Sequence, residues 1–462
     1  MRFRNGAEQH FQEVSTLTKG QAFAVIAGIL AAPLALAQDT ANTVAPVAGS
    51  FSKEIDNGAT AWMIAASVLV LLMTPGLALF YGGMVRRKNV LSTLLHSFIM
   101  MGIVSIVWML VGYTIAFGHT DNGFLGNFKN ALGNVSFSIP GGEAPRIPAA
   151  LYMLYQMMFA IITPALISGA VAERMKFSAY VMFTTLWLLV VYCPIACWVW
   201  NVNGWANKMG ALDFAGGTVV HLASGMAALA ACIMLGKRKS LERKEPILPH
   251  NLPLTLLGAG LLWVGWIGFN AGSATDVNPI AISGFAATQL AAAAGMIGWM
   301  LTEKLRFGKA TALGAASGLV AGLVVITPAS GYVDMMPAVL IGLLAGVICS
   351  FAVSLKSKFG FDDALDVVGV HGVGGFLGAI LTGVFASVII NHDSVDTALK
   401  NGRGALILHQ FIAAVAIGAF SFAASLLILA ITKVVTKGLR ATDEEEDTGL
   451  DITQHGEAAY NL

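Results

Sequence analysis

The sequence predicts an all-α integral membrane protein with eleven transmembrane helices, arranged as a 5+5 inverted repeat plus one extra helix. Three observations predict this class. Hydrophobic residues make up 56% of the 462 residues and charged residues only 11%, which is too little charge to hydrate a soluble chain of this length. Long apolar segments recur along the chain. Two similar polar strings, ending in His221 and His371, interrupt such segments 150 residues apart.

The N-terminal residues 1–37 have the pattern of a signal peptide. A basic stretch precedes the apolar run 22–35, and A-L-A at 35–37 is an Ala-x-Ala cleavage pattern. We therefore expect cleavage at this point, which would leave a short periplasmic segment, 38–57, at the new N-terminus. Because the charged leader is unusually long, an uncleaved first helix is the alternative.

Eleven apolar stretches follow, each long enough to cross about 30 Å of hydrocarbon. With the N-terminus outside, an odd number of spans puts the C-terminus inside. The basic residues support this orientation, since the predicted cytoplasmic segments hold 18 Lys or Arg and the outside segments of the mature chain hold six. The sequence thus divides into a membrane domain, 58–435, and a cytoplasmic tail, 436–462. The predicted spans lie near 60–84, 90–118, 149–172, 179–200, 214–236, 252–273, 280–303, 310–327, 334–355, 363–388 and 405–433.

The two histidines occupy matching places in the predicted halves. The first five spans start outside and the next five start inside, so His221 on span 5 corresponds to His371 on span 10. We pair Asp213 with Asp366, because each precedes its histidine near the start of the same span. At 1.5 Å per residue, the eight residues from Asp213 put His221 about 12 Å deep, near the midplane. A titratable ring at that depth indicates a permeation or proton pathway.

The remaining composition excludes other classes. A net charge of +1 gives no argument for a nucleic-acid partner. The four cysteines lie in apolar segments without a C-x-x-C pair, so we expect neither a disulfide framework nor a zinc site. No ATP-binding or hydrolase motif occurs, so we expect neither an enzyme nor a cofactor.

Several ordered strings closely resemble the ammonium transporter family, which is related to the Rhesus proteins. The resemblance runs from about residue 58 to H-G-E-A-A-Y-N at 455–461. It implies a homotrimer in the lipid bilayer of a bacterial inner membrane, in which each protomer has its own narrow apolar pore. It also implies uptake of ammonium or methylammonium by external recruitment, deprotonation, and passage of ammonia past paired histidines. The strings are Y-Q-M-M-F-A at 155–160, G-A-V-A-E-R at 169–174, P-I-A-C-W-V-W at 194–200, G-A-L-D-F-A-G-G-T-V-V-H at 210–221, W-I-G-F-N-A-G-S-A at 266–274 and D-V-V-G-V-H-G at 366–372.

The resemblance assigns roles to individual residues. Those implied to bind ammonium at the outer site are Trp200, Tyr155, Ser273 and Asp213, of which Tyr155 stands where relatives often have phenylalanine. Those implied to gate or wall the pore are Phe159, Phe269 and Trp266, and those implied to relay the proton are His221 and His371. We interpret Asp366 as a structural acidic residue.

Each assignment has a simpler alternative. Trp200 alone would be a tryptophan of the membrane interface. Asp213 would cap a helix, and we expect it both to cap and to act electrostatically. Phe159 and Phe269 alone would be ordinary core. Two neutral histidines without thiolate or carboxylate make a poor metal site, so no metal is expected.

A dry pore would select against potassium on physical grounds. An aromatic face attracts either cation by about 0.5–2 kcal/mol. A hydroxyl such as that of Ser273 accepts an N–H hydrogen bond, which potassium cannot donate. A permanent ion must lose its hydration in the apolar pore, whereas ammonium can leave a proton behind and cross as ammonia.

The tail carries D-E-E-E-D at 443–447 and then a segment of mixed composition. By composition alone it would be a solvated, disordered tail. The resemblance implies instead a folded segment under the neighbouring protomer and a docking surface for a PII-type signalling protein.

Two rival functions share this scaffold. An ammonium-sensing receptor is expected to carry a signalling domain, and only about 22 residues follow Arg440. A passive gas channel of the Rhesus type tends to lack the aromatic recruitment site that Trp200 and Ser273 indicate here. We therefore predict a transporter.

Overall fold

The computed structural model describes residues 55–137 and 147–460. The predicted signal peptide, its cleavage site and most of the segment 38–57 lie outside the described residues. Within them the chain is entirely helical apart from turns, loops and one isolated antiparallel bridge between Met175 and Arg440.

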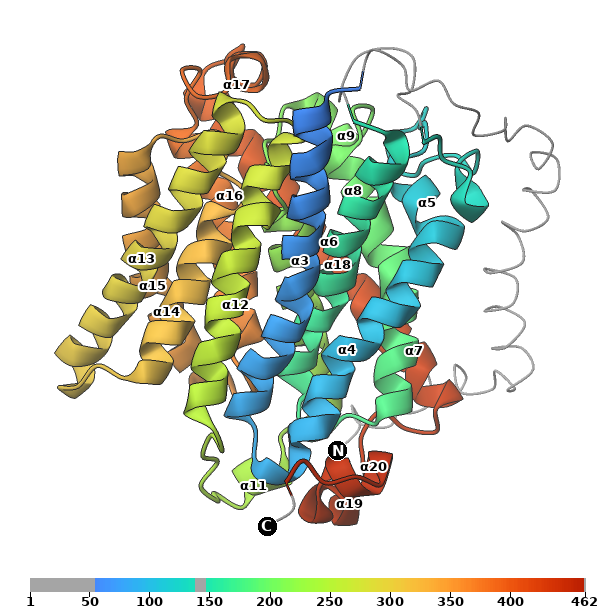
Figure 1. The fold of residues 1–462 in the computed structure, drawn as a ribbon. Coiled ribbons are helices and arrows are strands. Elements are labelled where there is room, and N and C mark those ends of the chain that lie inside the picture. Colours follow the sequence, from blue (N-terminus) through green and yellow to red (C-terminus); the bar gives the residue numbers. More distant parts are fainter. Residues whose placement is uncertain (1–54, 138–146, 461–462) are drawn as a thin grey trace, which may run out of the picture.

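The long helices form one bundle, with short helices at both of its ends (Figure 1). Four of the segments marked η are π-helical turns that continue into α-helices: η3, η5, η6 and η8. In chain order the helices are α3 (Asn57–Met84), η2 (Arg87–Asn89), α4 (Val90–Val107), η3 (Trp108–Gly112), α5 (Tyr113–Phe117), η4 (Ala131–Gly133), α6 (Ala149–Val171), α7 (Phe177–Trp187), η5 (Leu188–Tyr192), α8 (Cys193–Trp200), α9 (Trp205–Met209), η6 (Gly217–Leu222), α10 (Ala223–Leu235), α11 (Lys239–Glu242), α12 (Leu252–Ala271), η7 (Gly272–Ala274), α13 (Pro279–Phe307), α14 (Ala312–Ile326), α15 (Met335–Phe359), η8 (Val368–Val373), α16 (Gly374–Phe385), α17 (His392–Leu399), α18 (Arg403–Val435), α19 (Asp443–Thr448) and α20 (Leu450–His455).

Ten helical segments of the described chain are long and apolar enough to cross a membrane. They coincide with ten of the eleven predicted spans. The remaining predicted span, 310–327, corresponds to α14, an apolar helix of 15 residues. At 1.5 Å per residue α14 is about 22 Å long, shorter than the hydrocarbon core of a typical bilayer.

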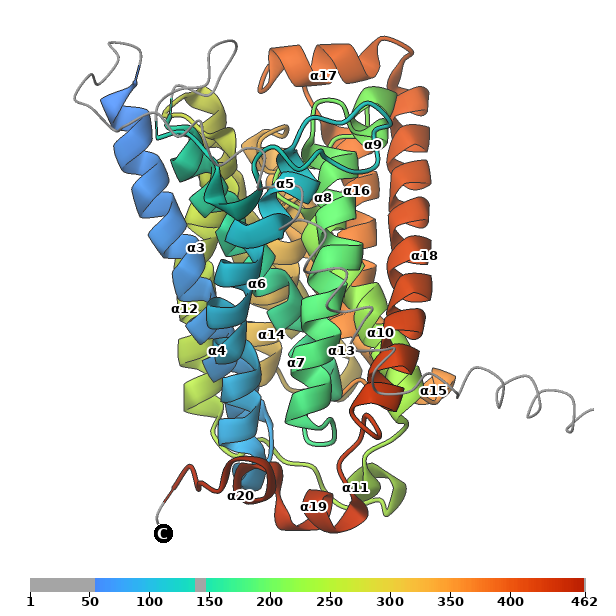
Figure 2. The same ribbon diagram turned by 90° about the vertical axis from the view of Figure 1, so that its right-hand side faces the viewer.

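The two ends of the bundle differ. The amphipathic helix α17 and the short helix α9 lie at one end, called here the α17 end (Figure 2). The helices α11, α19 and α20 lie at the other, called the tail end. The described chain begins at the α17 end with α3 and finishes at the tail end (Figure 1).

Local chemistry explains why many of these helices begin where they do. The first N–H groups of an α-helix have no partner inside the helix, and a side-chain oxygen at the N-cap satisfies one of them. The Asp56 carboxylate accepts from the Ala59 amide at 2.8 Å at the start of α3. Further side-chain N-caps are Asn251, Asn278, Thr311, Asp334, Asn391 and Thr442.

A buried ion network joins distant segments at the tail end. Arg238 binds both carboxylate oxygens of Asp362 at 2.9 Å, and its Nη1 lies 3.1 Å from Glu173 Oε2. Glu173 also accepts from Arg86, whose Nε lies 3.0 Å away. Burial raises the pKa of Asp362, but the hydrogen bond and charge of Arg238 outweigh it and hold the pKa at about 2.

The tail is folded and packs against the same chain. Asp451 accepts from the backbone amides of Leu91 and Ser92 at the start of α4, at 3.1 and 2.8 Å. Arg243 binds both carboxylate oxygens of Asp447, at 2.8 and 3.0 Å. The tail is therefore an ordered layer beneath the bundle, as the resemblance implied, and its packing under a neighbouring protomer stays a prediction.

Candidate functional site

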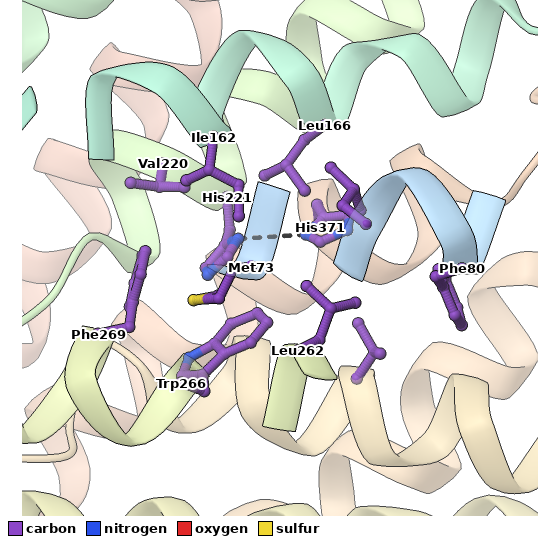
Figure 3. Close-up of a pocket in the computed structure, with 12 residues that line it drawn as sticks. Met73, Phe80, Ile162, Leu166, Val220, His221, Leu262, Trp266, Phe269 and His371 are labelled. Atoms are coloured by element: carbon purple, nitrogen blue, oxygen red, sulfur yellow. Dashed lines mark hydrogen bonds between the residues drawn. The ribbon is translucent and has the colours of Figure 1, made fainter. Parts of the chain in front are cut away.

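The two histidines meet at the centre of the bundle. His221 lies on η6 and His371 on η8, and their side chains are 1% and 3% exposed. Their Nδ1 atoms are 3.1 Å apart, within hydrogen-bonding distance, and their ring centroids are 5.2 Å apart (Figure 3). The Nε2 of His221 is buried and has no hydrogen-bond partner among the described residues. Sequence reasoning identified both rings, and the fold brings them together.

Asp213 holds the start of η6. Its Oδ1 accepts from the amides of Gly216 and Gly217 at 2.8 and 2.7 Å. Its Oδ2 accepts from the amides of Thr218 and Val219 at 2.8 and 3.3 Å, and from the Thr218 hydroxyl. Burial raises the pKa of the Asp213 carboxyl, against the lowering effect of these hydrogen bonds. The carboxylate therefore caps this segment from behind the outer site.

Asp363, and not Asp366, plays the equivalent part for η8. It accepts from the amides of Val367 and Val368 at 3.1 and 2.7 Å, four and five residues ahead, as Asp213 does. Like Asp213, it stands eight residues before its histidine. The predicted pairing of Asp366 with Asp213 was therefore wrong. A carboxylate can cap the segment only if it lies several residues before the first free amides, and Asp363 lies at that distance, whereas Asp366 is too close to them.

Asp366 corresponds instead to Gly216. Each lies five residues before its histidine, and each has a positive φ, 65° at Asp366 and 107° at Gly216. Such a conformation is uncommon for residues other than glycine, although aspartate tolerates it better than most. The Asp366 carboxylate forms an ion pair with Lys356, which is consistent with the structural role expected for it.

The histidine pair faces a very small apolar cavity. Its volume is about 10 Å³, the space of one water molecule. The Trp266 indole stacks on the His221 ring with centroids 5.3 Å apart, and its N–H donates to Thr327 at 2.9 Å, so it presents carbon to the cavity. Figure 3 shows Met73, Phe80, Ile162, Leu166, Val220, Leu262 and Phe269 around the pair, and Leu77 and Val320 complete the lining. Sequence reasoning identified none of the aliphatic residues of this lining, since nothing local distinguishes them from core residues.

A pair of stacked rings closes this cavity toward the α17 end. Phe159 on α6 and Phe269 on α12 stack with centroids 4.2 Å apart and an interplanar angle of 30°. Both are almost fully buried, and Phe269 also stacks on His221 at 6.1 Å. The two rings that the resemblance assigned to a gate are therefore stacked on each other, and their role as a gate stays a prediction.

Beyond the stacked pair lies a polar cavity of about 510 Å³ at the α17 end. Trp200, Ser273 and Asp213 all line it. The Trp200 indole donates to the backbone oxygen of Asp213 at 3.0 Å, which fixes its ring, and the ring stands edge-on to Phe159. The structure thus brings an aromatic face, a hydroxyl and a carboxylate residue together from three separate segments.

Tyr155 lies behind this cavity rather than on its wall. Its side chain is fully buried, and its hydroxyl donates to the Gly268 oxygen at 2.9 Å. It also lies 3.3 Å from the Ser273 hydroxyl, which itself donates to the Phe269 oxygen at 2.8 Å. Tyr155 therefore supports Ser273, and its predicted contact with substrate stays a prediction.

A second small cavity continues from His371 toward the tail end. Its volume is about 30 Å³. His371 bounds it together with Asp366, and Tyr81 and Ser317 add hydroxyl groups. The order along the bundle is therefore the polar outer cavity, the stacked phenylalanines, the histidine pair and a smaller, mostly apolar cavity.

Comparison with known proteins gives consistent matches over nearly the whole described chain. Residues 61–460 match the model of the Ammonium Transporter Family. The chain is 50% identical to the ammonium transporter of Bacillus subtilis over 405 residues, covering 87% of this chain and 98% of that protein. It is 42% identical to the ammonium transporter Amt1 of Archaeoglobus fulgidus over 406 residues, covering 88% and 100%.

Solved structures share the fold as well. Mep2 of Saccharomyces cerevisiae matches with a TM-score of 0.77 and 36% identity, covering 86% of this chain and 90% of that chain. A sensor Amt protein matches with a TM-score of 0.79 and 30% identity, covering 86% of this chain and 98% of that chain.

Proposed function

This chain belongs to the ammonium transporter family, a family of transporters rather than enzymes, and from that premise we propose how it carries ammonium. Ammonium binds in the outer cavity, passes the stacked phenylalanines, gives a proton to the free Nε2 of the histidine pair, and crosses the histidine region as ammonia while the pair relays the proton. The observation that carries this proposal is the hydrogen-bonded histidine pair facing a cavity of about 10 Å³.

Recruitment rests on the outer cavity. The Trp200 face offers a cation–π contact of about 0.5–2 kcal/mol. The Ser273 hydroxyl donates its hydrogen bond to the Phe269 oxygen, which leaves its lone pairs free to accept a hydrogen bond from ammonium. Asp213 adds negative charge behind the site, and its amide contacts keep it in place.

Exclusion of ions rests on the stacked pair and the small cavity. The space beyond Phe269 admits one small molecule, so an ion would arrive there without its hydration shell. Desolvating a permanent charge costs many kcal/mol. Ammonia has no net charge and meets the polar ring edges of the histidines.

The proton relay follows from the tautomers of the pair. A neutral imidazole has one donor nitrogen and one acceptor nitrogen. When the two Nδ1 atoms share one hydrogen bond, one ring has a free acceptor at Nε2 and the other has a free donor. A proton accepted at one Nε2 is matched by release from the other, after which the pair has swapped tautomers and stays neutral.

We extend the proposal to topology and setting. Eleven crossings, with the α17 end outside and the tail inside, are supported by the ten long apolar helices plus α14 and by the start and finish of the described chain at opposite ends. The matched positions of Asp213 with Asp363 and of Gly216 with Asp366 support the inverted 5+5 repeat. We place the protein, as a homotrimer, in a bacterial inner membrane, after removal of a signal peptide.

We also propose the tail as the docking surface for a PII-type signalling protein. The acidic helix α19 is held against the basic loop at α11 by the Arg243–Asp447 pair, so it forms a fixed surface at the cytoplasmic end. A sensing role on the same scaffold is the alternative, since one structural relative is a sensor Amt protein. Transport by the purified chain would decide between these roles.

The test is transport of ammonium and potassium, side by side, by purified protein in liposomes. We expect ammonium-evoked current without potassium current from the parent, and at least a tenfold loss of ammonium transport in His221→Ala and in His371→Ala, because the pore loses its polar lining and its relay. If both variants keep full ammonium flux and full exclusion of potassium, the pair is structural and the proposed mechanism fails.

A further inference from the structure

We infer that Gly225 and Gly375 are positioning residues that set the distance between the two histidine rings. The inference deepens the proposed function and rests on it, since it concerns the same proton relay. Each glycine lies four residues after its histidine, Gly225 after His221 and Gly375 after His371. Each packs against the backbone of the opposite π-helical segment.

The first contact is made by Gly225 at the start of α10. A methyl carbon on Gly225 would lie 2.2 Å from the backbone nitrogen of Gly372 and 2.3 Å from its Cα. Gly372 directly follows His371 in the chain. Ordinary carbon contacts are about 3.5–4.0 Å, so no side chain fits here without moving the two segments apart.

The second contact is the mirror of the first. A methyl carbon on Gly375 would lie 2.6 Å from the backbone nitrogen of Leu222 and 2.5 Å from the oxygen of Gly217. Leu222 directly follows His221. The residue after each histidine is therefore in backbone contact with the glycine one turn beyond the other histidine.

These reciprocal contacts control the ring pair. Both histidines lie on short segments whose backbones touch only because the glycines lack side chains, as at other close helix crossings. Relieving a 2.2 Å contact requires a shift of at least about 1 Å. The Nδ1–Nδ1 distance of 3.1 Å would then exceed hydrogen-bonding range.

The neighbouring glycine on the other side of the first contact provides a matched control. A methyl carbon on Gly372 would lie 3.5 Å from the Cα of Gly225, which is ordinary van der Waals contact. Gly260 on α12 provides a second control, because a methyl carbon there meets nothing within 4 Å. The four substitutions Gly225→Ala, Gly375→Ala, Gly372→Ala and Gly260→Ala thus add the same methyl group with different steric consequences.

The readout is the ratio of charge moved to methylammonium taken up. The current evoked by methylammonium and the uptake of radiolabelled methylammonium are measured on the same batch of liposomes. A general folding defect lowers both in proportion and leaves the ratio unchanged. Separating the rings breaks the relay, so Gly225→Ala and Gly375→Ala should lower the charge ratio about tenfold, while Gly372→Ala and Gly260→Ala should keep the ratio of the parent.

Several results would overturn the inference or the proposed function. An unchanged ratio in both tight variants overturns the inference, as does an equal fall in Gly372→Ala. Failure of both tight variants to yield folded protein also overturns it, because the glycines would then serve folding rather than ring placement. A parent that moves no methylammonium and no charge would instead reject the proposed function itself.

Discussion

Replacing Trp200 with leucine would remove the aromatic wall of the outer cavity while keeping an apolar side chain there. The indole contributes a cation–π contact of about 0.5–2 kcal/mol. Since about 1.4 kcal/mol corresponds to a tenfold change in affinity, the ammonium concentration that gives half-maximal current should rise about 2- to 30-fold. The maximal current should change much less, because the stacked phenylalanines and the histidine pair stay in place.

The assay is the concentration dependence of ammonium-evoked current in liposomes. Trp205→Leu is the matched control, since Trp205 lies five residues further along and does not line the outer cavity. The exchange at Trp205 should leave the half-maximal concentration unchanged. If Trp200→Leu saturates at the same ammonium concentration as the parent, the cation–π assignment is wrong, and Trp200 is only a membrane-interface residue.

Two further predictions concern topology and acid stability. A single cysteine replacing Lys129 should react with an impermeant maleimide from outside and one replacing Lys239 only from inside; the opposite labelling would reverse the proposed orientation. The pKa of Asp362 is about 2 in the folded protein and about 3.9 in a free chain. Its ion pair with Arg238 should therefore stabilise the protein fully above about pH 4, and this stabilisation should be lost as the pH falls toward 2. The contribution is roughly 2 kcal/mol. The midpoint temperature of thermal unfolding, measured in detergent, should therefore fall more steeply between pH 6 and 3 in the parent than in Asp362→Asn. Equal falls in the two proteins would refute this.

Much of the fold follows from the sequence because membrane spans are local features. A helix that crosses hydrocarbon must satisfy its own backbone and be apolar over some twenty residues, so length and composition reveal it. Ten predicted spans were confirmed as long apolar helices in this way. The predicted span at 310–327 forms the apolar helix α14, but its 15 residues are fewer than the roughly twenty that a membrane crossing requires.

The capping aspartates show where local reasoning fails. Asp213 was identified because its histidine follows eight residues later in the same string. Asp363 lies at the same spacing before His371, whereas the string D-V-V-G-V-H favours Asp366. Only the backbone geometry shows that Asp363 caps η8, whereas Asp366 has the conformation of Gly216.

By itself, the sequence determined the membrane class, the likeness to a transporter family and the two pore histidines, since these depend on composition, order and spacing along the chain. Only the tertiary structure decided that the rings share a hydrogen bond, that Phe159 stacks on Phe269, and that Gly225 lies against the segment of His371. These contacts join segments more than a hundred residues apart in sequence. The physical reason is that ring stacking, hydrogen bonding and backbone contact depend on distances of a few ångström in space, which packing of the whole bundle sets.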